Sequence, residues 1–220
     1  MLSIFRCLAA VSAVLLLMVA HQAQADDSAA YTAFLNTPNL KQNVVNSASR
    51  SIVIVQNPCA EAQYWIATSP IILKPMAFDG SGGPVAGLLK YPVKEEGCGA
   101  SRILNVFIVV QGPKQVAAIA SLPGGTHADP VLQRDAIPNA VIWAGSAVEK
   151  EDTCKARYVS DTEFLGYETP APGAKASSWR ERWTIALCDK KVAALLTFTP
   201  DATGTSFMIG KPVDGAETAK

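Results

Sequence analysis

The chain has 220 residues, and its 19 lysines and arginines balance 19 aspartates and glutamates, with two histidines besides. A formal net charge of zero gives no basic field for nucleic acid or an anionic membrane, so we expect neither as a partner. Hydrophobic residues make up 49% and charged residues 17%, a composition that folds, while 15 glycines and 14 prolines indicate many turns.

Residues 1–25 have the three parts of a secretory signal peptide. Arg6 supplies the positive start, residues 8–20 are apolar, and Ala23-Gln24-Ala25 is a small-x-small cleavage site. The apolar run is shorter than the roughly 20 residues that span a bilayer, and no later run is long enough. We therefore expect cleavage, no membrane span in the rest of the chain, and a periplasmic or secreted protein.

Four cysteines follow the signal segment: Cys59, Cys98, Cys154 and Cys188. An even number in an oxidising compartment predicts two disulfides, with three possible connectivities. A weak internal repeat favours Cys59–Cys98 and Cys154–Cys188, because their separations are similar and each first cysteine precedes an Ala and a Tyr. With no CxxC pair and His127 as the single histidine after residue 25, we expect no metal site, thiol-redox centre or cofactor.

The first third of the chain after the signal contains few regular patterns. We expect a short helix around residues 31–35. The β-branched run at residues 51–55, closed by Asn57-Pro58, predicts a buried strand. Residues 59–67 fit either helix or strand, and residues 79–84 form a loop because four of the six are Gly or Pro.

A hairpin and a helix are the best-marked elements in the middle of the chain. Residues 103–110 and 115–122 read as two strands joined by a turn at residues 111–114. The helix spans residues 129–144, with Asp129 as N-cap, proline at the first helical position and apolar residues at steps of four. Pro138 lies inside this helix and should kink or interrupt it.

The last third reads as a β-meander. Residues 145–178 are expected to be mostly loop, and residues 179–187, 192–199 and 205–209 to be three successive strands. The sequence therefore predicts an α+β fold of antiparallel hairpins and meanders with one clear helix. We divide it into halves at residues 26–146 and 147–220, which could also form one continuous domain.

Residues 91–143 carry a pattern of turns, strands and a helix: Tyr91-Pro92, Gly97, Gly99, a strand over 105–110, Gly112-Pro113, a strand over 116–120, Ser121, Gly124, Asp135-Ala136 and Trp143. This segment resembles the C-terminal domain of TonB-type energy transducers. The resemblance implies a small sheet backed by helices that binds partners in the cell envelope. The chain lacks a Pro-rich periplasm-spanning linker, so a true energy transducer is not expected.

The chain after residue 25 also resembles a family of exported bacterial proteins, through Gly97-Cys98-Gly99, residues 124–130 and residues 179–183. This resemblance implies an exported location and indicates nothing about function.

Three groups of residues are candidates for chemistry or binding. A hydrolase would use Ser121 as nucleophile, His127 as base and Asp129 as orienting group, although Asp129 also fits a helix cap. Gly124-Gly125-Thr126, just before a helix, could hold an anion on backbone N–H groups. The carboxylate pairs at residues 95–96 and 149–152 are not counted among these groups, because they read as solvated turns.

The third group is aromatic. Trp179, Trp183 and Phe198 would form an exposed face for sugar or lipid, or else part of the core.

These patterns together favour a non-catalytic interaction module that binds another envelope protein or peptidoglycan, with the strand at residues 115–122 as its docking edge. Two alternatives remain: a small secreted hydrolase using Ser121 and His127, and an apolar-ligand carrier with a cavity between the hairpins.

Overall fold

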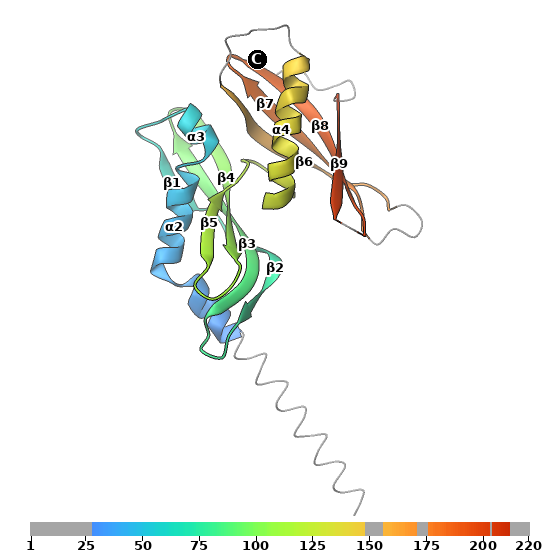
Figure 1. Ribbon diagram of the computed structural model, residues 1–220. Helices are drawn as coiled ribbons and strands as arrows, with labels where there is room; N and C mark the ends of the chain where they lie inside the picture. Colours follow the sequence, from blue (N-terminus) through green and yellow to red (C-terminus); the bar gives the residue numbers. More distant parts are fainter. Residues whose placement is uncertain (1–27, 148–155, 171–175, 203, 212–220) are drawn as a thin grey trace, which may run out of the picture.

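The computed structural model describes residues 28–147, 156–170, 176–202 and 204–211. It contains two antiparallel sheets, each with a helix packed on one face. Figure 1 shows the two sheets as separate lobes joined by the segment that leads into α4. The predicted α+β class with antiparallel hairpins is therefore confirmed.

The first lobe begins with a helix over residues 28–35, as expected, and continues with α2 (Pro38–Ala48) and α3 (Ile52–Gln56). Its five strands are β1 (Gln63–Ile66), β2 (Ile71–Phe78), β3 (Pro84–Gly97), β4 (Ala100–Val110) and β5 (Val116–Ala120). β1 and β2 pair with successive parts of β3, and the order continues through β4 to β5 at the opposite edge.

The first lobe has its core between α2 and one face of this sheet. Every second residue of β3 and β4 points to the same face, and these side chains meet the buried stripe of α2; the cluster comprises Leu40, Val44, Ala48, Ile54, Leu89, Tyr91, Val93, Leu104, Val106, Ile108 and Val110. The opposite face of the sheet is turned toward the second lobe and carries Lys90, Asn105 and Phe107.

The second lobe consists of α4 (Pro130–Ser146) and the sheet β6 (Arg157–Tyr167), β7 (Trp179–Leu187), β8 (Lys190–Pro200) and β9 (Thr205–Gly210), in that order. The buried residues of α4 recur at steps of four and pack on this sheet: Leu132, Ala136, Ala140 and Ala144. Because α4 belongs to the second core, the halves divide before Pro130 rather than after residue 146.

The cap of α4 matches its sequence signature, but its interior proline behaves differently. The Asp129 carboxylate accepts hydrogen bonds from the amides of Val131 and Leu132, both 2.9 Å long. The helix runs from Pro130 to Ser146 without interruption, so the interruption expected at Pro138 is wrong, while the alternative, a kink there, stays a prediction. The buried residues on both sides of Pro138 pack on one sheet, which supports a continuous helix.

Two predicted segments differ in the structure. Residues 52–55 belong to the helix α3, with Ser51 as its N-cap, and do not form a strand. The Ile54 and Val55 amides bond to the Ser51 carbonyl, and buried and exposed residues do not alternate. Residues 157–167, expected to be loop, form strand β6, whose exposed charges obscured the alternation. The other strands at 103–110, 115–122, 179–187, 192–199 and 205–209, and the loop at 79–84, are confirmed within a few residues.

The two lobes share a topology, which supports the weak repeat seen in the sequence. Each has a helix followed by antiparallel strands, and its two central strands are joined by a two-residue turn that begins with a cysteine. Cys98 and Cys188 both adopt left-handed backbone conformations, with φ of 48° and 54°. Counted from these turns, Val93 corresponds to Trp183.

The structure describes one disulfide rather than the two expected. Cys59 and Cys98 are joined across a sequence separation of 39 residues, which confirms that pairing. The second expected bridge joins Cys188 to Cys154, and Cys154 lies outside the described residues, so it stays a prediction.

Candidate functional site

The backbone amides of residues 124–128, in the segment between the two lobes, all donate hydrogen bonds within the protein. The N–H groups of Gly124, Gly125, Thr126, His127 and Ala128 donate, in that order, to Ile103 O, Thr162 O, Thr162 Oγ1, Glu181 Oε1 and Thr126 Oγ1. Gly124 has φ +85°, and a Cβ there would lie 2.1 Å from the carbonyl oxygen of Thr162. Since all five donors have protein acceptors, the expected anion cradle at Gly124-Gly125-Thr126 is not formed.

The residues of the candidate hydrolase site have other partners. The Ser121 hydroxyl donates to Oε1 of Gln133 at 2.7 Å, and Asp129 caps α4. The His127 ring stacks on Phe164 with centroids 3.8 Å apart, and its Nδ1 lies 3.1 Å from the Tyr167 hydroxyl. The described residues therefore show no hydrogen bond that links Ser121, His127 and Asp129.

The two tryptophans on β7 donate hydrogen bonds to a buried carboxylate. Glu181 is 0% exposed and accepts hydrogen bonds from the indole Nε1 of Trp179 at 2.9 Å and of Trp183 at 2.8 Å. It also accepts the backbone amide of His127 at 2.7 Å. Trp183 and Phe198 are themselves fully buried, so the exposed aromatic face is absent and these residues belong to the core.

A buried lysine from the other lobe faces this carboxylate. Lys90, on β3, donates from Nζ to the carbonyl oxygen of Thr126 at 2.7 Å. Burial lowers the pKa of Lys90, and Glu181 partly restores it. Burial also lowers the pKa of His127, and the positive charge of Lys90 lowers it further while Glu181 opposes both. This network ties the two sheets together through the segment between them, and neither Lys90 nor Glu181 stands out in the sequence.

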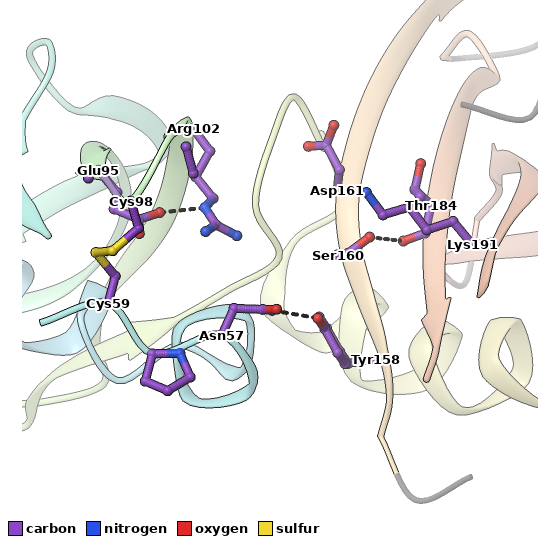
Figure 2. A pocket seen from close by; sticks show the side chains of 13 residues that line it. Asn57, Cys59, Glu95, Cys98, Arg102, Tyr158, Ser160, Asp161, Thr184 and Lys191 are labelled. Carbon is purple, nitrogen blue, oxygen red and sulfur yellow. Dashed lines mark hydrogen bonds and ion pairs between the residues drawn. A yellow bond between two sulfur atoms is a disulfide. The ribbon is translucent and has the colours of Figure 1, made fainter. Parts of the chain in front are cut away.

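A polar cleft of about 640 Å³ opens between the lobes. Figure 2 shows its walls: β3, β4 and the Cys59–Cys98 disulfide on one side, and β6 and its neighbouring strands on the other. Where the lobes approach each other, the amide Nδ2 of Asn57 donates to the Tyr158 hydroxyl at 2.6 Å. The mainly polar and charged lining does not favour an apolar ligand.

The first wall of the cleft carries a buried ion pair. Glu95 is 0% exposed and pairs with Nε of Arg102, its register partner on β4. This corrects the expectation that residues 95–96 form a solvated turn, because the hairpin places Glu95 inside the structure. Oε1 of Glu95 has no hydrogen-bond partner among the described residues.

The second wall of the cleft carries Asp161 and Lys191. The Asp161 side chain is exposed to solvent, but partial burial of its carboxyl raises its pKa. A backbone hydrogen bond from Thr162 lowers this pKa, Glu163 raises it, and the cations Lys191 and Arg102 lower it. Figure 2 shows Arg102 and Asp161 on opposite sides of the opening. The cleft thus presents a cation and an anion that face each other.

The outer edge of the first sheet is a separate feature. β5 pairs with β4 alone among the described strands. The Ser121 amide donates to Asn105 O and the Gln111 amide to Gln115 O, which fixes these as hydrogen-bonded pairs. Because such pairs alternate along an antiparallel ladder, Ala117 directs its N–H inward to β4, and Ala118 directs its N–H to the free edge. Ser47 of α2 accordingly reaches the outward carbonyl of Ala118.

A groove of about 320 Å³ lies at the end of this edge, between the start of α3 and the first turns of α4. Its lining is largely apolar, with Ile119 and Phe107 among the apolar residues, and it also includes the cationic side chains of Arg50 and Arg134. The Ser51 hydroxyl lines the groove, is buried, and has no hydrogen-bond partner among the described residues. The groove therefore combines apolar surface, two cations and an unused hydroxyl beside an open strand edge.

Comparison with known proteins gives no match: no family model fits the chain, and neither the curated proteins nor the solved structures include a significant relative. Within the described part of the chain, no helix is long and apolar enough to cross a membrane. The described residues also bring together no group of three or more His, Cys, Asp or Glu side chains able to hold a metal ion.

Proposed function

We propose that this protein is an exported, non-catalytic interaction module of the cell envelope, which binds an extended segment of another envelope protein by strand addition to β5. The observation that carries the proposal is the open edge of β5, where backbone N–H groups point away from the sheet next to an apolar groove. An extended peptide can pair with such groups and place alternate side chains in a neighbouring groove.

The groove also indicates what the bound segment contains. An apolar side chain of the bound segment would pack against the exposed Ile119, and an acidic side chain would pair with Arg50 or Arg134, which both line the groove. Arg134 pairs only with its exposed neighbour Asp135 among the described residues, an interaction that is weak in water. A polar group beside the acidic residue would satisfy the Ser51 hydroxyl. The partner segment is therefore extended, partly apolar and acidic.

The export proposal rests on the signal-like residues 1–25 and agrees with the disulfide between Cys59 and Cys98. Cell fractionation and N-terminal sequencing test it directly. A protein that starts at Asp26 and lies outside the cytoplasm is the expected result. A cytoplasmic protein that keeps residues 1–25 would contradict it.

The docking proposal is tested with a random peptide-display library selected on the purified protein. Selected peptides should bind Ala118→Gly, which keeps the outward N–H, and should lose binding to Ala118→Pro, which lacks it. Both variants should fold, since this N–H takes no part in the ladder. Ala117→Pro removes an inward N–H and should unfold or strongly destabilise the protein.

Two results would overturn the docking proposal. The first is a folded Ala118→Pro variant that binds the selected peptides as tightly as Ala118→Gly. The second is a library selection that enriches no peptide above background, or enriches only peptides that bind elsewhere. Binding to purified peptidoglycan that survives Ala118→Pro would favour the alternative partner class.

A further inference from the structure

The cleft between the lobes is separate from the β5 edge. Its charged residues suit a small charged ligand and not an extended peptide strand. Arg102 is held by Glu95 through Nε, so the terminal nitrogens of its guanidinium stay available toward the opening, as Figure 2 shows. These planar donors match a carboxylate. On the opposite wall, the accessible Asp161 carboxylate provides a counterpart for an ammonium group.

We infer that the cleft binds small zwitterions that carry a free carboxylate and a free amino group, namely amino acids or short peptides. The ligand carboxylate meets the guanidinium of Arg102, and its ammonium group meets the carboxylate of Asp161.

Two further observations support a ligand in this place. Glu95 is fully buried, lines the cleft, and has in Oε1 an acceptor without a partner among the described residues. Buried acceptors are normally satisfied, and an N–H group of a ligand would satisfy this one. The volume of about 640 Å³ also lies within the range of small-molecule sites.

The lining of the cleft argues against simple ions. Two cations and two carboxylates line it, namely Arg102, Lys191, Glu95 and Asp161, so neither sign of charge dominates. A plain anion would meet Asp161 and Glu95, and a plain cation would meet Arg102 and Lys191. A zwitterion pairs with both signs at once, because its own charges are separated across the opening.

The test is isothermal titration calorimetry of the purified protein with L-Ala-L-Ala and D-Ala-D-Ala, and with acetate and ethylamine as single-charge probes. At least one dipeptide should bind, and each single-charge probe should bind at least tenfold more weakly. A preference for D-Ala-D-Ala would point to peptidoglycan stem ends as the source, and a preference for L-Ala-L-Ala to free peptides.

The variants separate this site from the rest of the molecule. Asp161→Asn and Arg102→Lys should each weaken dipeptide binding about tenfold, as expected for losing one charge-assisted hydrogen bond. Glu163→Gln is the matched control: it removes a carboxylate on the same strand that pairs with Arg182 outside the cleft and should leave binding unchanged. Arg102→Lys keeps a cation beside Glu95, and a thermal unfolding transition confirms that each variant folds.

Three results would overturn the inference: no dipeptide binding, acetate or ethylamine binding as tight as the dipeptides, or equal weakening by Glu163→Gln and Asp161→Asn. Ala118→Pro at the β5 edge should leave dipeptide binding intact, so a failure of the docking proposal and a failure of this one are distinguishable.

Discussion

Replacing Glu181 should destabilise the protein more than a surface substitution does, because this buried carboxylate interacts with residues of both lobes and of the segment between them. Glu181→Ala leaves the Trp183 indole N–H and the His127 amide without their acceptor, and each such buried donor costs about 1–3 kcal/mol. It also removes the carboxylate whose charge partly offsets the burial of Lys90, which adds to the loss. Because the two costs overlap, we expect a total of about 3–5 kcal/mol, a large part of a typical stability of about 5–15 kcal/mol.

Glu181→Gln should cost less, about 1–3 kcal/mol, because the amide keeps one acceptor oxygen but presents an N–H group to Trp183 Nε1. Urea unfolding followed by tryptophan fluorescence measures both variants. Glu163→Ala, which breaks a surface ion pair, is the control and should change stability by less than about 1 kcal/mol. A loss below about 1 kcal/mol for Glu181→Ala, or equal losses for the two Glu181 variants, would refute the reasoning.

Three further predictions follow from the same geometry. Asp129→Ala should cost about 1 kcal/mol in urea unfolding through the lost cap of α4, and no loss would show that the cap is unimportant. Burial lowers the pKa of His127 below its ordinary 6.5, so the unfolded chain takes up this proton more readily. The contribution of His127 to the free energy of unfolding should therefore be fully present above pH 6.5 and decrease as the pH falls below that value. In His127→Gln, the free energy of unfolding should decrease less between about pH 7 and pH 5. An unchanged pH dependence in this variant would contradict the prediction. Non-reducing peptide mapping should find Cys154 linked to Cys188, and a link between Cys154 and Cys98 would contradict both pairings.

The parts of the fold that could be predicted depend on local signals. Asp129-Pro130 marks the start of α4 because a cap and a first-turn proline act within one turn. The alternation at residues 179–187 reveals β7 because every second side chain enters the core. Residues 51–55 were wrongly predicted as a strand because β-branched residues can also form a single helical turn. Here the hydrogen bonds of the run come from residues close in sequence and not from a partner strand.

The residues of the candidate sites were harder to predict because their contacts lie far apart in the sequence. Glu95 reads as a surface charge until the turn at Cys98-Gly99 is placed, which makes it the register partner of Arg102. Lys90 and Glu181 lie on different sheets, and no local pattern brings them together. The edge position of β5 agrees with the expected docking strand, because a short strand with small side chains after a turn ends the first sheet.

The most direct test of the docking proposal is amide hydrogen exchange of the protein with and without a peptide selected from the display library. The edge N–H groups of Val116, Ala118 and Ala120 point away from β4, so bound peptide should slow their exchange, while the already paired Ala117 and Ile119 change much less. Protection confined to another part of the chain, with the amides of Val116, Ala118 and Ala120 unchanged, would contradict strand addition at β5.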